Sequence, residues 1–174
     1  LVLDGVPCGF VRGVWGGGVT ASVANEVRGT STNEKRIMGV HYKPLTMVFS
    51  FPRSERLCGW ISDFLAMKNT RMNGAICFTA PDLTPIRELQ FHDAVITEID
   101  FPPCDAESEV ECEVHITIVS PSIQEGTGEK IDPVLLSTKQ RKSFESNFRL
   151  EIDGLNSKDV VKVDGITVAL NTAE

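Results

Sequence analysis

The chain has 174 residues, of which 41% are hydrophobic, enough for one domain with a real core. No run of eighteen apolar residues occurs, so no segment is long enough for a membrane-spanning helix. The net charge of −7 disfavours gripping nucleic acid through its phosphates. Five cysteines at irregular spacing argue against a disulfide framework and favour a reducing compartment such as a bacterial cytoplasm.

The charge is unevenly distributed along the chain. Residues 1–87 carry a net charge of +4, whereas residues 88–129 contain eleven acids and no Lys or Arg. Two interpretations stay open: complementary surfaces that steer head-to-tail association, or an acidic face that serves solubility. Because the chain begins at Leu1 rather than Met, we also expect a fragment of a longer protein.

The first forty residues read as strands. A short strand over Leu1–Asp4 ends in an Asp4-Gly5 turn, and a second covers Val11–Trp15. Gly16–Gly18 then predicts a bulge or sharp bend. It is not a phosphate loop, because no helix follows and the glycine spacing does not match.

Residues 19–42 predict a long hairpin with a polar tip. Val19, Ala21, Val23 and Val27 alternate onto one face, residues 28–35 form a polar loop, and Arg36–Tyr42 resumes an extended pattern. A long hairpin is marginal alone and offers unpaired edges to another chain. It is therefore either an arm that docks on a neighbour or a surface hairpin without a partner.

Next come a strong strand over Leu45–Phe51 and a helix over about 54–68. Ser54 is placed to cap the helix N-terminus. An apolar stripe at the helical period predicts the buried side; its members are Leu57, Trp60, Ile61, Phe64 and Leu65.

The second half alternates as strands do. Met72–Ala75 is typical of a tight turn before a short strand over Ala75–Phe78. A long strand over Ile86–Phe101 is expected to point Val95, Ile99 and Phe101 inward. The next strand is expected to bury Val110, Cys112, Val114, Ile116 and Ile118. Residues 120–140, rich in Pro, Gly, Ser and Thr, read as a linker.

The tail resembles the head of the same chain. Leu150–Leu155 matches Leu1–Val6, and Val160–Gly165 matches Val11–Gly16, both at an offset of 149 residues. We therefore predict a domain over 1–120, a linker over 121–147, and the start of a truncated second copy over 148–174. Chance similarity between two Asp-Gly turns is the alternative.

No catalytic or metal-binding pattern appears. His41, His92 and His115 lack metal-ligand spacing, and no nucleophile constellation is visible, so we expect no enzyme activity, metal or cofactor. Trp15 and Trp60 are expected in the core. Five acids alternate and would share an exposed strand face as surface charge; they are Asp105, Glu107, Glu109, Glu111 and Glu113.

Several weak motifs in order resemble the tail tube proteins of contractile phages and related contractile injection systems. The resemblance covers residues 1–120 and rests on Lys35–Met47, Leu57–Ile61, Arg71–Ile76, Phe91–Asp105 and the alternating strand that follows. It implies a mainly β fold, a β-sandwich or barrel-like domain with one flanking helix and an extended hairpin. It also implies six-fold or pseudo-six-fold rings stacked into a hollow tube.

The resemblance further implies roles for the two surfaces. The hairpin would contact neighbouring subunits through eight residues: Val23, Glu26, Arg28, Lys35, Arg36, Met38, His41 and Tyr42. The acidic residues would line a lumen through which DNA or protein cargo slides without specific binding. Expected partners are copies of the chain, sheath and baseplate proteins, in a virion tail or injection particle assembled in the bacterial cytoplasm, with no membrane partner.

The repeated tail departs from that family and favours a hub, tube-initiating or adaptor component. Two further alternatives are a type VI secretion tube protein and a monomeric β-sandwich module that binds a ligand.

Overall fold

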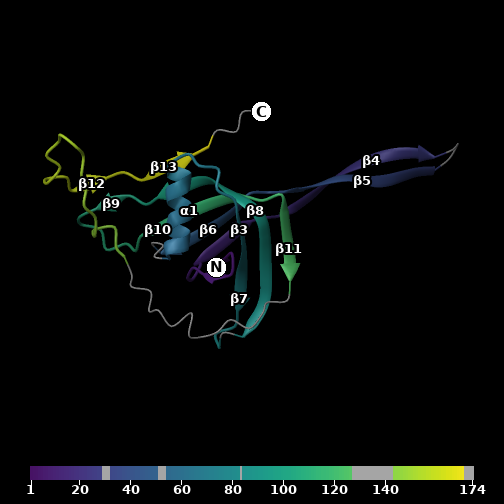
Figure 1. The fold of residues 1–174 in the computed structure, drawn as a ribbon, viewed down its shortest axis with the longest axis horizontal. Coiled ribbons are helices and arrows are strands. Elements are labelled where there is room, and N and C mark those ends of the chain that lie inside the picture. Colours follow the sequence, from purple (N-terminus) through teal and green to yellow (C-terminus); the bar gives the residue numbers. More distant parts are fainter. Residues whose placement is uncertain (29–31, 51–53, 83, 127–142, 171–174) are drawn as a thin grey trace.

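The computed structural model describes residues 1–28, 32–50, 54–82, 84–126 and 143–170, and only the backbone of residues 25–28 and 32–34. Within these residues there is one helix, and nine strands join in one antiparallel sheet. The mainly β fold with a flanking helix and a projecting hairpin is thereby confirmed (Figure 1). The sheet is not a closed barrel, because the order runs from β2 to β3 without these two strands pairing in the described part.

The long strand β8 (Pro85–Phe101) organises the sheet. Its first part pairs with β7 (Met72–Thr79) and β11 (Ser122–Gly126), and its second part pairs with β10 (Glu113–Val119) and β13 (Ile166–Ala169). The change of partners falls at Asp93, whose φ of 54° breaks the extended backbone. One strand therefore belongs to both halves of the sheet.

The remaining strands extend each half. β1 (Val2–Leu3) joins β7 and carries β2 (Val6–Pro7), with the predicted turn at Asp4 and Gly5 between them. β6 (Leu45–Ser50) joins β10 and carries β3 (Gly13–Gly16). One buried cluster links both halves; among its members are Leu3, Phe91, Ile123, Met47 and Ile116.

The helix α1 (Glu55–Leu65) covers the core with Leu57, Trp60, Ile61 and Phe64, four of the five predicted stripe residues. Leu65 was predicted buried but is 47% exposed. The helix stops before residue 68 because Met67 adopts a left-handed φ of 58° and its N–H donates to the Phe64 carbonyl. Ser54 is the N-cap as predicted, but its side chain makes no capping hydrogen bond.

Three strand predictions need correction. The sequence around Gly74 is not a turn but part of β7, where a Cβ would lie 2.6 Å from the Val2 carbonyl oxygen, so only glycine lets β1 approach. Val110 is 60% exposed, because β10 starts only at Glu113. In β8 the register shifts where it pairs with β10, so Ala94, Ile96 and Ile99 are buried while Val95 is only half-buried. Phe101 packs against the core as predicted.

The region predicted as a linker contains structure. Within it, Ser122–Gly126 forms β11 on β8; residues 127–142 lie outside the described part. The tail then forms a separate two-stranded sheet, in which β12 (Lys162–Val163) pairs with β9 (Cys104–Asp105), and joins the main sheet through β13. The division into a first domain and a truncated second copy stays a prediction.

Candidate functional site

The hairpin of β4 (Val19–Arg28) and β5 (Thr32–Tyr42) forms its own two-stranded sheet and projects from the body (Figure 1). Strands of this length span about 30 Å at roughly 3.4 Å per residue. We call this hairpin the arm. Its predicted extent, residues 19–42, is confirmed.

The base of the arm is fixed by the glycine run. Gly16 and Gly17 have positive φ values of 88° and 65°, and a Cβ on Gly16 would lie 2.1 Å from the Pro44 carbonyl oxygen. That carbonyl accepts a hydrogen bond from the Gly17 N–H, and the Gly18 carbonyl accepts one from the Lys43 N–H. The bend predicted from the glycines is therefore what turns the chain from β3 into the arm.

One face of the arm is apolar over its proximal half. Residues directly opposite each other share a face, and the pairs are Val19 with Tyr42, Ala21 with Val40, and Val23 with Ile37. A register shift between Ser22 and Val23 leaves Met38 as the extra residue of β5 and brings Ile37 opposite Val23. The opposite face carries Thr20, Ser22, Gly39 and His41.

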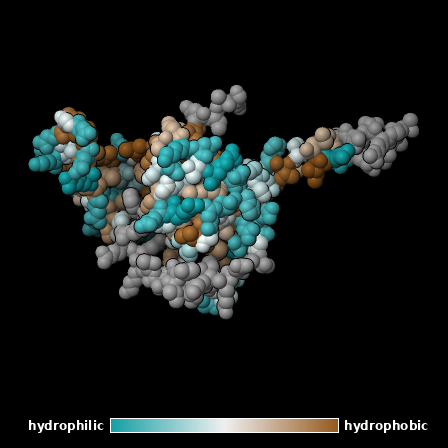
Figure 2. Space-filling model, in the orientation of Figure 1, coloured by the Kyte–Doolittle hydropathy of each residue, from teal (hydrophilic) through white to brown (hydrophobic). Residues whose placement is uncertain are grey.

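This apolar face is uncovered. The exposed fractions are 60% for Val19, 54% for Val23, 66% for Ile37 and 48% for Val40. Figure 2 shows hydrophobic side chains gathered on the arm next to the body. Aliphatic side chains that share one face and contact no core are typical of a surface that another molecule covers.

The eight residues predicted for the arm interface fall into three groups. Val23, Lys35, Arg36, Met38 and His41 are exposed, while Tyr42 is partly buried and packs against the core. Glu26 and Arg28 are placed by backbone register alone, opposite Glu34 and Thr32. The prediction missed Ile37 and Val40, because the bulge at Met38 interrupts the alternation that would have revealed them.

The predicted acidic row is divided between a loop and a sheet. Asp105 ends β9, and Glu107 and Glu109 lie in the loop that follows, so none of the three shares a strand face with Glu113. The Glu107 N–H donates to Asp105 Oδ1 at 3.0 Å and Lys162 lies 3.2 Å from Asp105 Oδ2. Both contacts lower the pKa of Asp105.

Glu111 and Glu113 lie on the outer side of the sheet, the side away from the core. Glu111 Oε2 lies 2.6 Å from Arg12 and its Oε1 accepts a hydrogen bond from the Ser50 hydroxyl at 3.0 Å. Glu113 Oε1 accepts a hydrogen bond from Arg12 at 2.9 Å. Glu111 is half-buried, so its prediction as plain surface charge is wrong.

Two acids of β8 join this surface and were missed. Asp100 lies opposite His115, and Glu98 lies opposite Thr117, so both share the outer side with Glu113. The alternation of these two acids with the apolar Ile99 was the sequence signal that could have placed them on the outer side. The outer side thus carries Glu98, Asp100, Glu111 and Glu113 with Arg12; we call these five residues the acidic face.

Trp15 covers part of the same side and is not a core residue. It is 51% exposed and meets His115 edge-on, with ring centroids 5.5 Å apart. The prediction of a buried Trp15 is wrong because β3 points Val14, not Trp15, toward the core. Trp60 is buried as predicted and its Nε1–H donates to the Thr70 carbonyl at 3.0 Å.

The described residues hold no group of three or more His, Cys, Asp or Glu side chains that could hold a metal ion. Among the same residues, no helix has the length and apolar character needed to cross a membrane. The surfaces with a distinct chemistry are therefore the arm and the acidic face.

Comparison with known proteins places the fold. No protein-family model matches the chain, and no curated protein matches it. Solved structures do. A chain of the PVC sheath–tube complex of an extracellular contractile injection system aligns with a TM-score of 0.57 and 18% identity over 73% of this chain and 86% of that one.

Two further alignments come from the anti-feeding prophage. A chain of its tube-terminating cap gives a TM-score of 0.55 and 17% identity over 71% of this chain and 82% of that one. A chain of its baseplate gives a TM-score of 0.53 and 13% identity over 72% of this chain and 88% of that one. The protein therefore has the fold of contractile injection system components, and at these identities the likeness is one of fold.

Proposed function

We propose that this protein is a structural subunit of a contractile tail or injection particle, which self-assembles into rings of a tube or tube-initiating hub. The uncovered apolar face of the arm carries the proposal. An aliphatic row on a thin hairpin has no core of its own. Full burial of such a side chain stabilises by about 1.5–3 kcal/mol, and the exposed part of each would contribute roughly half of that. A neighbouring copy would supply that cover.

The fold supports this assignment. The aligned chains belong to structures described as a sheath–tube complex, a tube-terminating cap and a baseplate, so the same architecture serves several positions along such particles. Fold alone does not determine function. The arm adds an observation on this chain that points in the same direction.

We assign the lumen wall to the acidic face. Its carboxylates alternate with Thr46 and Thr117, whose hydroxyls lie 2.9 Å apart, and Arg12 partly neutralises two of the acids. Such a surface presents no cluster of cations to a polyanion. DNA or protein cargo would pass without specific binding.

The role of a hub or adaptor depends on the prediction that the tail begins a second copy of the first domain. Gly154 of the tail has a φ of 81°, close to the 80° of Gly5, its counterpart in the matching segment. Sheath and baseplate proteins as partners, and assembly in a bacterial cytoplasm, belong to the same proposal. A type VI secretion tube is the alternative within it.

The test compares the two faces of the arm. We expect the double variant Val23→Lys and Val40→Lys to lose rings, because it puts charge on the apolar face. Thr20→Lys with Ser22→Lys adds the same charge to the opposite face and serves as the matched control. Particle mass by light scattering and negative-stain images give the readout, with circular dichroism as the fold check.

Rings in the control and smaller particles in the apolar-face variant would support the proposal. If both variants assemble equally, the apolar face is not the interface. A wild-type chain that stays monomeric at every concentration would favour the alternative of a monomeric β-sandwich binding module.

A further inference from the structure

The tail is attached to the body by strand addition. β13 pairs along the free side of β8, with Ile166 opposite Phe101 and Ala169 opposite Glu98. The Leu170 N–H continues the ladder by donating to the Thr97 carbonyl at 2.8 Å. Backbone hydrogen bonds therefore run from Thr97 to Phe101 along this edge.

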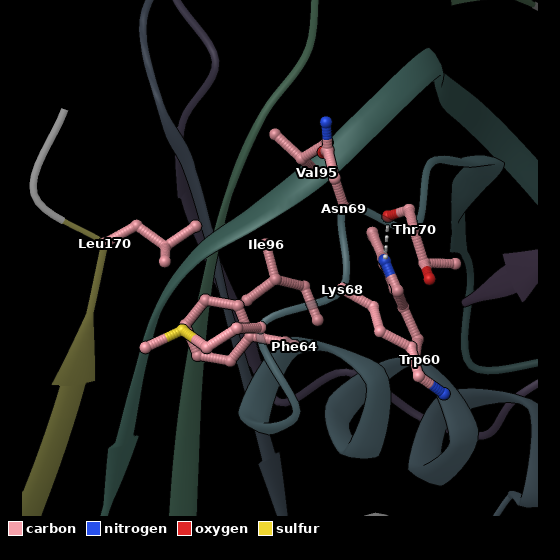
Figure 3. A pocket seen from close by; sticks show the side chains of 9 residues that line it. Trp60, Phe64, Lys68, Asn69, Thr70, Val95, Ile96 and Leu170 are labelled. Carbon is pink, nitrogen blue, oxygen red and sulfur yellow. Dashed lines mark hydrogen bonds between the residues drawn. The ribbon is translucent and has the colours of Figure 1, made fainter.

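Two alternate side chains of the tail face the body, Val168 half-buried and Leu170 42% exposed. Val168, opposite the fully buried Ile99, packs against the core. Leu170 lines a hollow of about 90 Å³ between α1 and β8, together with Phe64, Met67 and Ile96 (Figure 3). Main-chain pairing combined with pockets for every second side chain is how proteins bind an extended peptide at a sheet edge.

The tail is also held on segment 104–112 of the same chain, by the pairing of β12 with β9 and by backbone hydrogen bonds such as that from the Glu145 N–H to the Val110 carbonyl, but its side chains are poorly covered. None of the described residues 143–170 is buried, and the exposed fractions are 66% for Leu155, 66% for Val161 and 55% for Ile166. Residues 166–170 are thus held on β8 mainly by backbone pairing, as a strand ligand is. A ligand of this kind can come from its own chain or from another copy with identical contacts.

We propose that the edge Thr97–Phe101, with the hollow beside it, is a strand-acceptor site for residues 166–170 of a second copy, so that neighbouring subunits exchange tails. This inference rests on the ring of the proposed function, which holds a neighbour's tail at a local concentration comparable to that of the chain's own. The contacts are the same in both arrangements, while exchange also brings the uncovered apolar side chains of the tail against the neighbour.

A disulfide trap tests the exchange directly. Thr167 and Asp100 are opposite each other, with the Thr167 hydroxyl donating to Asp100 Oδ1 at 2.5 Å, so cysteines at both positions suit a disulfide. Full-length chains carrying only Thr167→Cys are co-expressed with chains carrying only Asp100→Cys, oxidised, and run on a non-reducing gel. We expect a covalent dimer at least tenfold above that of either variant alone.

Two controls define the background. The unsubstituted chain measures cross-linking by the five native cysteines. Thr167→Cys combined with Glu113→Cys tests a position on the same sheet side but out of register. The doubly substituted chain, with both cysteines of the pair, should give a ladder of covalent multimers if tails exchange.

Negative-stain images of the same samples separate this inference from the proposed function. Rings without the dimer, and a doubly substituted chain that forms only an internal disulfide, would overturn exchange and leave the ring proposal standing. The dimer without rings would support exchange and contradict the ring. Monomers with an internal disulfide alone would overturn both.

Discussion

At the scale of single residues, Asp4 joins three elements. Its backbone N–H donates to the Asn73 carbonyl, its Oδ1 accepts a hydrogen bond from the Asn73 N–H at 3.2 Å, and its Oδ2 pairs with Arg56 of α1. The hydrogen bond from Arg56 is the main cause that lowers the pKa of Asp4. One carboxylate therefore ties the β1–β2 turn to β7 and the helix.

The Asp4–Arg56 pair predicts a pH dependence of stability. Because the pKa of Asp4 is lowered in the folded state, its contribution is fully present above the unfolded value of about 3.9 and is lost progressively as the pH falls from there through the lowered folded pKa. Asp4→Asn keeps the turn geometry and should cost about 0.5 kcal/mol at pH 7, because the pair is partly exposed and screened. Urea unfolding at pH 7 and pH 3 measures this.

Arg56→Gln is the control for the pair. If the pair accounts for the effect, Arg56→Gln should cost as much as Asp4→Asn, and the double variant little more than either. A difference between wild type and Asp4→Asn that persists unchanged at pH 3 would show that the charge is not the cause.

A pair of glycine substitutions tests the packing of β1 on β7. A Cβ at Gly74 would lie 2.5 Å from Phe91 Cζ and 2.6 Å from the Val2 carbonyl oxygen, so Gly74→Ala should destabilise by about 1–3 kcal/mol. Gly59 lies exposed in α1 with nothing within 4 Å of a Cβ, so Gly59→Ala should stabilise by about 0.5–1 kcal/mol. Thermal unfolding measures both; equal shifts would contradict this packing.

Predictions for single residues failed where a strand distant in sequence determines the residue's position. Asn73-Gly74 is typical of a turn, yet Gly74 is required in mid-strand by the approach of β1. Trp15 is large and apolar, yet the register of β3 on β6 places it on the outer side. Pairing partners distant in sequence set both results, and no local pattern records them.

At the scale of elements, the sequence predicted the buried residues of regular helices and strands but not those beside irregularities of the backbone. The stripe of α1 and the alternation of β6 and β10 predicted most of the core, because a single buried face forces a regular spacing. The positive φ at Met67 and Asp93 and the bulges in β5 and β8 ended or shifted that spacing. Ile37 and Val40 were missed next to the bulge in β5.

Shortening the arm tests its role as an element. Deleting residues 28–35 joins Val27 to Arg36 and leaves residues 25–27 as a three-residue connection from Ala24 to Arg36, which are already paired. The body makes its core without these residues, so its unfolding temperature should change little. Assembly should be lost, because the distal reach of the arm is gone.

Gel filtration beside thermal unfolding measures both properties of this variant. Undiminished rings would show that the distal part of the arm is not needed for contact between subunits. A large drop in the unfolding temperature would show that the arm supports the body rather than a neighbour.

At the scale of the whole molecule, two surfaces follow from one topology. The glycine bend after β3 sends the arm away from the body, while β3, β6, β10 and β8 present the acidic face. The block of eleven acids over 88–129 signalled an acidic surface, but its position required the pairing of β8 with β10. The arm faces a neighbour in the proposed ring, and the acidic face faces its lumen.

The central claim is that copies of this chain assemble through their arms. The most direct measurement is the particle mass of the unmodified chain by light scattering over a range of concentrations and salt, with negative-stain images of each fraction. The account predicts rings or short tubes that grow with concentration. A strict monomer of 19.1 kDa under all conditions would contradict it.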